Sequence, residues 1–548
     1  MNARTDDQLS PRPSTANPAS TCLALFRASV ARAPDADAIL YFDGRLSYAD
    51  LDRLSDAMAA GLIARGFDRG DRLGIYVQNM PHCAIAMLAA WKAGGIPVPI
   101  NAMNREREVT LLLADFEPKA FVLTPELYRD VLARLPDTVV RPDIVLGASP
   151  FDFQTRNDPR VLPADMPASV EGLEDMLGFI QAFEGETPPH HVPAGDDIAC
   201  LIYTSGTTGV PKGAMILHRN VAAGVAVNCE LFEAVGSDRV LGMAPLFHVT
   251  GMLSMNMMWG VAGGLILCYR FEPGVMVEAV REHQATLVMG AATAYIAMMN
   301  APGASPDDMK TLRRAGSGGA PTPPAVAEAA SRFLGVPIQN GYGMTETAIA
   351  TNLTPFEQPI PVDPENGALS IGPLVPGVKA WIERAEGGAA ADGEAGELVV
   401  SGPTLTGGYW RKPAETAEVF REDGFRTGDI AIRDANGWYY IVDRKKDMIV
   451  ASGFKVWPRE VEDVLYGHPA VREAAVVGVE DPYRGETVRA VVSLKPGTAV
   501  SIEELETHCR EKLATYKRPR EIAIVDELPK TPSGKILRRM LRGEDWRG

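Results

Sequence analysis

The segment Leu201–Gly213 decides how the rest of the chain is interpreted, and it reads Leu-Ile-Tyr-Thr-Ser-Gly-Thr-Thr-Gly-Val-Pro-Lys-Gly. Its apolar start predicts the end of a buried strand. The hydroxyl and glycine residues that follow are Thr204, Ser205, Gly206, Thr207, Thr208 and Gly209. Side-chain hydroxyls, backbone N–H groups and Lys212 together suit a polyanion such as a triphosphate, and the glycines let the backbone approach it closely. A flexible surface loop is the alternative interpretation of this composition.

The order of residues in this segment excludes the Walker phosphate loop. Pro211 stands where that loop needs its second glycine, and Gly213 stands where a serine or threonine would contact magnesium. The order Thr-Ser-Gly-Thr-Thr-Gly-Val-Pro-Lys-Gly instead resembles the phosphate-binding signature of the adenylate-forming superfamily. That superfamily includes acyl- and aryl-CoA synthetases, adenylation domains of peptide synthetases and firefly-type luciferases. The resemblance implies that Thr204–Gly209 and Lys212 bind the phosphates of ATP.

A second informative segment, Gln339–Thr347, reads Gln-Asn-Gly-Tyr-Gly-Met-Thr-Glu-Thr. Tyr342 offers a flat face for a purine, Thr345 a hydroxyl for a phosphate oxygen, and Glu346 a carboxylate for Mg²⁺. An ordinary turn before a helix would use Thr345 and Glu346 as capping residues instead. The segment resembles the family signature in which these three residues take those three roles. By that resemblance, the neighbouring nucleotide-binding residues are Asn340, Gly341 and Gly343.

Two further segments resemble the walls of the family's substrate pocket. Gly318, Gly319 and Ala320 match an element that contacts the adenine and the acyl group, although a simple strand-to-helix connection would need similar residues. His248 follows the phosphate loop and, by resemblance, lies beside the reacting carboxylate; a lone histidine in apolar surroundings is otherwise a core residue. The resemblance and the apolar sequence around these segments imply an acyl pocket formed by His248, Met252, Gly318 and Met344. Met252 belongs to a methionine-rich stretch that fits plain core equally well.

The C-terminal third supplies the remaining candidate residues. Asp429 closes a Phe-Arg-Thr-Gly-Asp motif, and its carboxylate offers only acceptors, which suits the two hydroxyls of a ribose. The resemblance assigns Arg444 to the ribose as well, Lys446 to the hinge of a mobile domain, and Gly453 to the tunnel for the pantetheine of coenzyme A. Two alternatives remain: Asp429 would be an ordinary turn residue, and the charge run around Arg444 would be a solvated surface.

Lys535 lies in Pro529–Arg539, a basic segment that would ordinarily be a solubilising tail. Its surrounding prolines and glycine predict a loop that can direct a single ammonium group into another domain's cleft. The segment resembles a family motif whose lysine bridges the substrate carboxylate and the α-phosphate. We therefore expect Lys535, Thr345, Glu346 and His248 to form the catalytic group, with Glu346 as the metal ligand.

Composition limits the class of protein. A chain of 548 residues predicts two or more domains, and a net charge of −16 argues against nucleic acid as the main partner. Six scattered cysteines without a CxxC pair predict free thiols in a reducing compartment, and hence a cytoplasmic protein. The uncharged stretch Val249–Tyr269 has the length of a membrane span, but its glycines favour a helix followed by a buried strand, without stable membrane insertion. A homo-oligomer stays possible.

The pattern of helices and strands predicts an α/β fold. Ser47-Tyr-Ala-Asp50 has the form of a capping box, and strand, helix and strand follow at Arg72–Val77, Pro81–Lys92 and Ile96–Pro99. The resemblance implies a large N-terminal domain of two parallel-sheet lobes plus a β-barrel-like lobe, with a small mobile C-terminal α+β lid. We expect a disordered tail over residues 1–20, the large domain over 21–442, a hinge over 443–447 and the lid over 448–548.

The resemblance extends from Cys22 to Arg539 and implies an ATP-dependent carboxylic acid–CoA ligase that forms an acyl-adenylate intermediate. Coenzyme A is the expected acceptor because thirteen residues after Lys535 leave no room for a carrier-protein domain. The sequence from Asp443 to Phe454 resembles fatty-acid–CoA ligases most, so medium- or long-chain fatty acids are expected. Aryl or alicyclic acids, a luciferase-like monooxygenase and a non-catalytic binding module are the alternatives.

Overall fold

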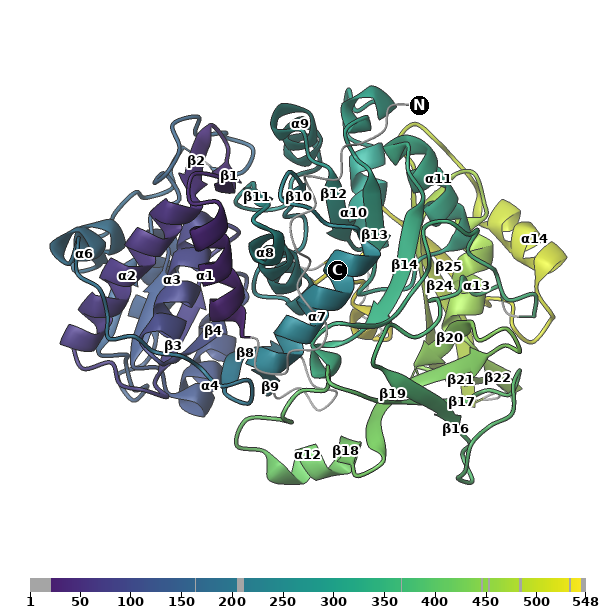
Figure 1. The fold of residues 1–548 in the computed structure, drawn as a ribbon. Coiled ribbons are helices and arrows are strands. Elements are labelled where there is room, and N and C mark those ends of the chain that lie inside the picture. Colours follow the sequence, from purple (N-terminus) through teal and green to yellow (C-terminus); the bar gives the residue numbers. More distant parts are fainter. Residues whose placement is uncertain are drawn as a thin grey trace, which may run out of the picture.

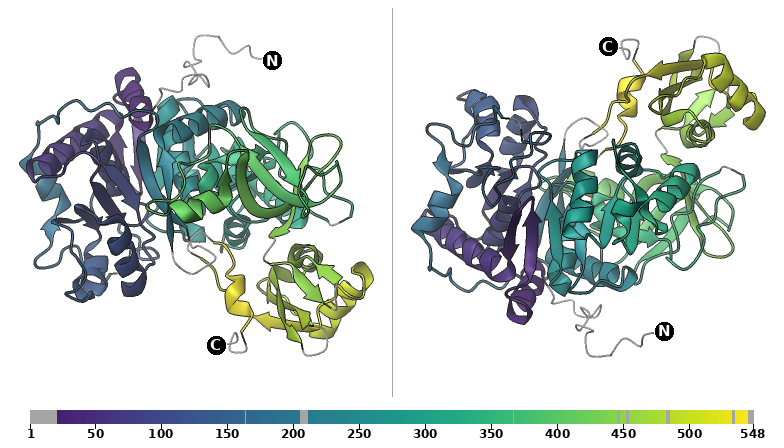
Figure 2. Two further views of the ribbon diagram at one scale, coloured as in Figure 1. Left: turned by 90° about the horizontal axis from the view of Figure 1, so that it is seen from below. Right: turned by 90° about the horizontal axis from the view of Figure 1, so that it is seen from above.

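The computed structural model describes residues 21–162, 164–204, 211–365, 367–444, 447–451, 454–481, 485–531 and 534–543. The tail expected over residues 1–20 lies outside this range. A large body holds two sheets flanked by helices and a third, antiparallel sheet, and a small unit follows it along the chain (Figure 1). In both views of Figure 2 this small unit lies beside the large body.

The first lobe is built on a fully parallel sheet of order β4-β3-β5-β6-β7. Its strands are β3 (Arg72–Tyr76), β4 (Ile96–Pro99), β5 (Ala120–Leu123), β6 (Ile144–Gly147) and β7 (Glu174–Asp175). The helices of this part of the chain are α2 (Tyr48–Ala64), α3 (Pro81–Lys92), α4 (Glu106–Phe116), α5 (Pro125–Asp130), η2 (Leu132–Arg134) and α6 (Met176–Ala182). Ser47 and Asp50 form the expected capping box at the start of α2. Every residue of α3 is buried, as expected of a helix that is apolar on all sides.

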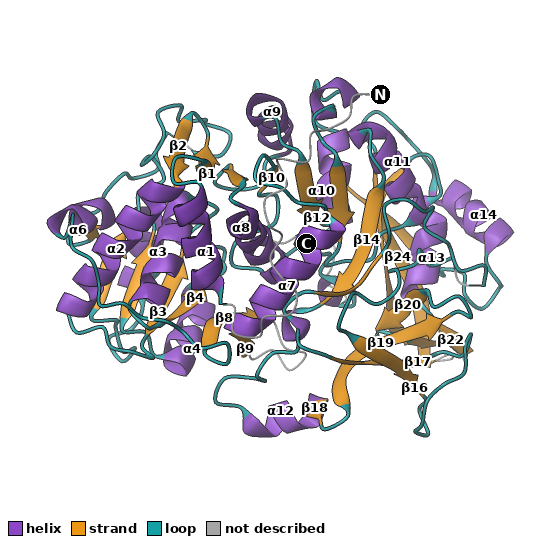
Figure 3. Ribbon diagram, viewed as in Figure 1, coloured by secondary structure: helices purple, strands orange, loops and turns teal. Residues whose placement is uncertain are grey.

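The second lobe is an eight-stranded sheet of order β15-β14-β13-β12-β10-β11-β1-β2. Its inner pairs are parallel, and only the edge strands β2 and β15 run antiparallel to their neighbours. The strands are β1 (Asp37–Tyr41), β2 (Gly44–Ser47), β10 (Arg239–Leu241), β11 (Gly264–Leu267), β12 (Leu287–Gly290), β13 (Arg314–Ser317), β14 (Ile338–Gly343) and β15 (Ala350–Leu353). The helices are α1 (Cys22–Arg32), α7 (His218–Leu231), α8 (Val249–Val261), α9 (Pro273–His283), α10 (Ala292–Met299), η3 (Pro306–Met309), α11 (Pro324–Leu334) and η4 (Thr345–Thr347). Figure 3 shows this alternation of strands and helices, which confirms the predicted α/β class.

A hairpin of β8 (Ile198–Thr204) and β9 (Lys212–Leu217) follows the first lobe in the chain. The third sheet is antiparallel. Its strand order is β16-β17-β19-β18, and β20 also pairs with β19. The strands are β16 (Lys379–Glu383), β17 (Gly396–Ser401), β18 (Phe420–Arg421), β19 (Gly424–Arg433) and β20 (Tyr439–Arg444), and helix α12 (Pro413–Val419) lies between β17 and β18 in the chain. The β19–β20 hairpin turns at Asn436-Gly437 as predicted, and Gly437 takes a positive φ of 84°. This sheet is the lobe that we expected to resemble a β-barrel.

The small C-terminal unit has its own sheet and core. Its elements are β21 (Ile449–Ala451), β22 (Phe454–Val456), α13 (Pro458–Tyr466), β23 (Val471–Asp481), β24 (Gly485–Leu494), α14 (Ile502–Lys512), β25 (Glu521–Val525) and η5 (Arg538–Leu541). Apolar residues of α13, α14 and the strands form a cluster separate from the core of the large body. This arrangement confirms the predicted small α+β domain.

Strand β20 extends into the segment that we expected to form the hinge. The hinge was expected over residues 443–447, but β20 continues through Arg444. The Asp443 carboxylate is buried, and it accepts a hydrogen bond from the backbone N–H of Arg459 at 3.1 Å. Arg538 lies 3.6 Å from the same carboxylate and binds Glu462 at 2.5 Å. Because these partners satisfy its charge, Asp443 can extend a strand instead of entering solvent.

The uncharged stretch Val249–Tyr269 forms the expected helix and strand, α8 and β11, inside the main core. Within the described residues, no helix combines the length and the apolar character needed to cross a membrane. All six cysteines are buried free thiols, as their spacing predicted.

Candidate nucleotide and carboxylate site

The decisive segment forms the β8–β9 hairpin. Thr204 and Lys212 are cross-strand partners at its end, so residues 205–211 connect the two strands. The predicted phosphate-binding residues Ser205, Gly206, Thr207, Thr208 and Gly209 lie outside the described residues. The predicted strand is confirmed, and the base of the loop is closed where Thr204 Oγ1 lies 3.5 Å from the carbonyl oxygen of Lys212.

A strap formed by residues 406–410 runs along this hairpin. The backbone N–H of Met215 donates to the carbonyl of Gly408 at 2.9 Å, and that of Trp410 donates to Gly213 at 2.8 Å. Between these two bonds, the hydroxyl of Tyr409 donates to Glu346 Oε1 at 2.8 Å. The strap therefore joins the phosphate-loop hairpin to the predicted metal ligand.

Sequence reasoning missed Tyr409 as a functional candidate. Its segment, Gly407-Gly-Tyr-Trp410, reads from the sequence only as part of a β-rich stretch. The structure places the Lys212 ammonium 5.2 Å from the centroid of the Tyr409 ring. A tyrosine that follows two glycines was the only local signal, and it did not indicate which residues the ring would meet.

The predicted nucleotide residues gather where β13, β14 and β19 end or bend. A Cβ added to Gly318 would lie 3.3 Å from the carbonyl oxygen of Gly341, so the two glycine segments pass close together. The hydroxyl of Tyr342 donates to Asp429 Oδ2 at 2.6 Å, and Asp429 is buried. Arg444 is the cross-strand partner of Asp429, which places both ends of the predicted ribose pair on adjacent strands. The side chain of Arg444 lies outside the described part of the chain.

Neighbouring backbone segments fix the position of β14. The side-chain amide of Asn340 donates to the carbonyl of Ser370 at 2.8 Å and is buried. A Cβ added to Gly343 would lie 2.5 Å from the carbonyl oxygen of Ile349, so this position accepts only glycine. Thr345 and Glu346 then begin η4, and Glu346 is 8% exposed. The backbone thus fixes the direction of both predicted catalytic side chains.

His248 caps the start of α8, where its Nδ1 accepts the backbone N–H of Thr250 at 3.3 Å. Burial and the charge of Lys535 lower the pKa of His248 to about 4. His248 is therefore neutral at pH 7, and the ammonium of Lys535 acts on it across the boundary between the two parts of the molecule. Met252 is buried with its Sδ 3.2 Å from Cys200 Sγ. Met344 packs against the core of the antiparallel sheet.

A hydrogen bond joins the loop that carries Lys535 to the second lobe of the large body. Thr293 on α10 donates its hydroxyl to the carbonyl of Gly534 at 2.9 Å. Gly534 has a φ of 81°, and a Cβ there would lie 2.6 Å from Thr293 Oγ1. Within the loop, the N–H of Lys535 donates to Thr531 Oγ1 at 3.0 Å. The two other residues assigned to this domain, Lys446 and Gly453, lie outside the described residues.

The residues near Glu346 fit a magnesium ion that is held partly by nucleotide phosphates. Among the described residues, no group of three or more His, Cys, Asp or Glu side chains could form a complete metal site. Mg²⁺ in nucleotide enzymes is commonly bound by one or two carboxylates plus phosphate oxygens and water. A single buried carboxylate whose orientation is fixed by Tyr409 matches that pattern.

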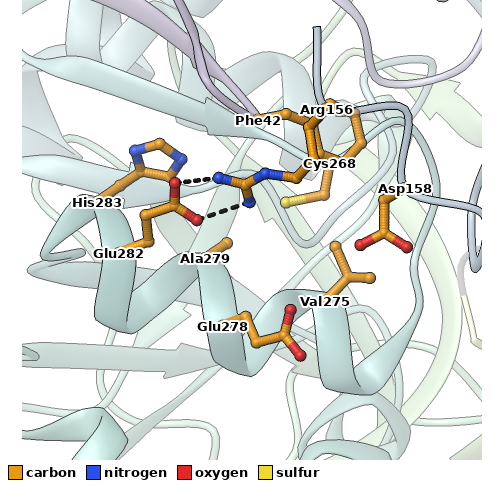
Figure 4. A pocket seen from close by; sticks show the side chains of 9 residues that line it. All are labelled: Phe42, Arg156, Asp158, Cys268, Val275, Glu278, Ala279, Glu282 and His283. Carbon is orange, nitrogen blue, oxygen red and sulfur yellow. Dashed lines mark hydrogen bonds and ion pairs between the residues drawn. The ribbon is translucent and has the colours of Figure 1, made fainter. Parts of the chain in front are cut away.

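A small hollow under α9 is a different kind of feature (Figure 4). It has room for about 10 Å³, which is at most one water molecule. Arg156 and Glu282 are paired across it, and Arg160 pairs with Glu278 at 2.5 Å. Its charges are therefore already satisfied, and we do not consider it a ligand site.

Comparison with known proteins places this site in a family. A model of the AMP-binding enzyme family matches residues 26–410, and a model of the AMP-binding enzyme C-terminal domain matches residues 460–535. The long-chain-fatty-acid–CoA ligase of Bacillus subtilis (strain 168) is 35% identical over 542 residues, covering 96% of this chain and 95% of that protein. A feruloyl-CoA synthase of Amycolatopsis sp is 36% identical over 517 residues, covering 93% and 96%. The crystal structure of ATP-bound MatB from Rhodopseudomonas palustris matches with a TM-score of 0.82 at 28% identity, covering 96% of this chain and 99% of that one.

The chain therefore belongs to the AMP-binding enzyme family, and it is an AMP-forming acid–CoA ligase of the adenylate-forming superfamily. The fold class and the type of reaction that the sequence predicted are confirmed.

Proposed function

We propose that the enzyme activates medium- or long-chain fatty acids as acyl-adenylates and transfers them to coenzyme A. The observation that carries this proposal is the 2.9 Å hydrogen bond from Thr293 to Gly534, because it attaches the Lys535 loop to the lobe that also carries His248. The fatty-acid preference is supported by the 35% identical long-chain-fatty-acid–CoA ligase.

The proposed residue roles follow from the charges that must meet. A carboxylate attacks the α-phosphorus of ATP, so the enzyme has to bring two anions into line and neutralise them. Lys535 screens the approaching oxygens, and Thr345 steadies the α-phosphate. Lys212 and the hydroxyl-rich loop hold the outer phosphates. Mg²⁺ bound at Glu346 would add charge neutralisation as pyrophosphate leaves.

A second group of residues binds the nucleoside part of ATP. Asp429 accepts the ribose hydroxyls, and Tyr342 keeps its carboxylate in place through the 2.6 Å hydrogen bond. Arg444 assists at the ribose. Gly318 and Gly341 let the adenine pass close to the backbone. The other residues proposed to contact the nucleotide here are Gly319, Ala320, Asn340 and Gly343.

The second half-reaction needs a different arrangement. Lys535 occupies the face that a thiol must use, so the C-terminal unit rotates about Lys446 before coenzyme A reacts. Gly453 then lines the pantetheine tunnel. The contact of the Lys535 loop with α10 supports the assignment of the present arrangement to the adenylate-forming step.

An aryl acid is the second candidate substrate, because the feruloyl-CoA synthase is 36% identical over nearly the whole chain. Acid-dependent exchange of labelled pyrophosphate into ATP, measured with alkanoic and aryl acids, separates the two. We expect the fastest exchange with medium- or long-chain acids, followed by consumption of free coenzyme A. Faster exchange with aryl acids would replace the fatty-acid assignment. Oxygen-dependent product would indicate a monooxygenase, and absence of exchange with every acid would indicate a binding module.

A further inference from the structure

We propose that Tyr409 is a positioning residue that orients Glu346 and holds Lys212 apart from it. This inference rests on the proposed function, in which Glu346 binds the metal and Lys212 binds phosphate. The hydroxyl and the ring face of one side chain serve the two charged groups separately.

The position of Tyr409 is fixed on several sides. Its backbone N–H donates to Thr416 Oγ1 at 2.9 Å, and its backbone bridges to Ala214 of β9. The ring of Phe420 packs edge-on at 6.0 Å. Tyr409 is 8% exposed, so its hydroxyl has little access to water as an alternative partner. The hydrogen bond to Glu346 is therefore maintained by the surrounding structure.

This bond leaves Glu346 with one oxygen already satisfied. A carboxylate with a fixed rotamer and one remaining oxygen is suited to a metal ion that is shared with phosphate oxygens. Thr406, on the same strap, also donates its N–H to the backbone carbonyl of Glu346 at 3.0 Å. The side chain and the backbone of Glu346 are thus both held by residues 406–410.

The ring has a second effect, on Lys212. The ammonium of Lys212 lies over the aromatic face, 5.2 Å from the ring centroid, and no salt bridge of Lys212 is found among the described residues. A cation over an aromatic ring is attracted by the ring without being paired with a carboxylate, so its charge can still act on a phosphate. Glu346 and Lys212 contact the same side chain, so a smaller residue would allow them to pair directly. The ring keeps both charges available for Mg²⁺ and phosphate.

A purely structural role for Tyr409 predicts a different result. The backbone bonds of the strap to β9 do not involve the hydroxyl, so Tyr409→Phe would retain them. Loss of the hydroxyl would then lower the melting temperature at most, with no change in the magnesium dependence of nucleotide binding.

The test is the affinity for ATP measured by calorimetry with and without Mg²⁺, together with Mn²⁺ binding followed by electron paramagnetic resonance. We expect Tyr409→Phe to weaken Mn²⁺ binding in the presence of a non-hydrolysable ATP analogue about tenfold, since it removes a hydrogen bond to a charged group. Metal-free ATP binding should stay within about twofold. Tyr409→Leu should additionally weaken metal-free ATP binding about threefold through loss of the ring under Lys212.

Tyr440→Phe is the matched control, because its hydroxyl also donates to a carboxylate, Asp434 at 3.2 Å, on the far hairpin. It should leave metal and nucleotide binding unchanged. Equal metal binding by wild type and Tyr409→Phe would overturn the role of Tyr409 while leaving the proposed function intact. A wild-type protein that binds no Mg²⁺–ATP at all would overturn both.

Discussion

The predicted phosphate-binding part of the site and the Lys535 loop differ in the contacts that fix their positions. On the phosphate side, the β8–β9 hairpin, the strap of residues 406–410 and Glu346 are joined by backbone and side-chain hydrogen bonds within one body. The Lys535 loop reaches its position across a boundary, where the Thr293–Gly534 hydrogen bond attaches it. A small apolar cluster of Tyr466 with Ala292 and Ile296 lies nearby.

This difference separates two tasks that an adenylating ligase has to perform. In the proposed mechanism, the groups that bind ATP act in both half-reactions and lie within the large body. Lys535 would assist only the first half-reaction, and it lies on a loop of the C-terminal unit that would rotate away before the second. Substitutions on the phosphate side should therefore change the affinity for ATP. Substitutions in the Lys535 loop should change the rate of adenylate formation alone.

The largest effect is expected from removal of the lysine itself. Lys535→Ala should lower the rate of adenylate formation by about 10²- to 10³-fold, because a preorganised charge at the transition state is lost. Transfer of pre-made adenylate to coenzyme A should be nearly unchanged, as single-turnover measurements of each step would show. Lys495→Ala is the control, since Lys495 is in the same unit and its ammonium donates to the carbonyl of Pro469. Equal loss of both steps would contradict the assigned role.

On the rigid side, Asp429→Ala should raise the Kd for ATP about 10- to 100-fold, because hydrogen bonds from the ribose to a charged acceptor are removed. Binding of the acid should change less, as calorimetry with each ligand would show. Asp392→Ala alters an exposed carboxylate of the same lobe, paired with Arg433, and should leave both affinities unchanged. An unaltered nucleotide Kd in Asp429→Ala would remove this residue from the ribose site.

The attachment of the loop can be weakened without touching the lysine. Gly534→Ala places a Cβ against Thr293 and forces a left-handed backbone at a cost of about 1 kcal/mol. Adenylate formation should fall about fivefold. Gly497→Ala has a similar φ of 74° but no neighbour near its Cβ. It should lower the melting temperature to a similar degree and leave adenylation unchanged. The same loss of rate in both variants would show that backbone strain, and not the contact, limits the reaction.

The smallest effect concerns protonation of His248. Its pKa of about 4 lies below the ordinary value of 6.5, so folding favours the neutral ring. This group therefore reduces stability progressively as the pH falls from about 6.5 to about 4, where the unfolded chain binds the extra proton. An NMR titration should show the pKa of His248 rising in Lys535→Ala, since one of its two causes is removed. His468, whose pKa is lowered by burial and by His508, should titrate alike in both proteins. An unshifted His248 would mean that Lys535 lies elsewhere in solution.

Local patterns predicted most of the fold because short-range chemistry determines it. The capping box at Ser47, the apolar helix Pro81–Lys92 and the Asn436-Gly437 turn each depend on residues within a few positions of one another. The phosphate-loop hairpin could also be predicted, since an apolar strand has to end where the hydroxyl and glycine residues begin.

The contacts that join the site could not be predicted in this way. Tyr409 meets Glu346 across 63 positions, and Thr293 meets Gly534 across 241. Neither pair has a spacing that a helix or a strand would impose. The burial of Asp443 was missed for the same reason, because Arg538 lies far along the chain.

The ion pair between Asp443 and Arg538 connects the large body to the segment that carries Lys535. Asp443 is the second-last residue of β20, and Arg538 follows Lys535 by three positions. One guanidinium group therefore binds the strand end before the linker, and it also binds Glu462 of α13. Any movement of the lysine loop relative to β20 or α13 therefore has to break one of these ion pairs or carry both partners with it.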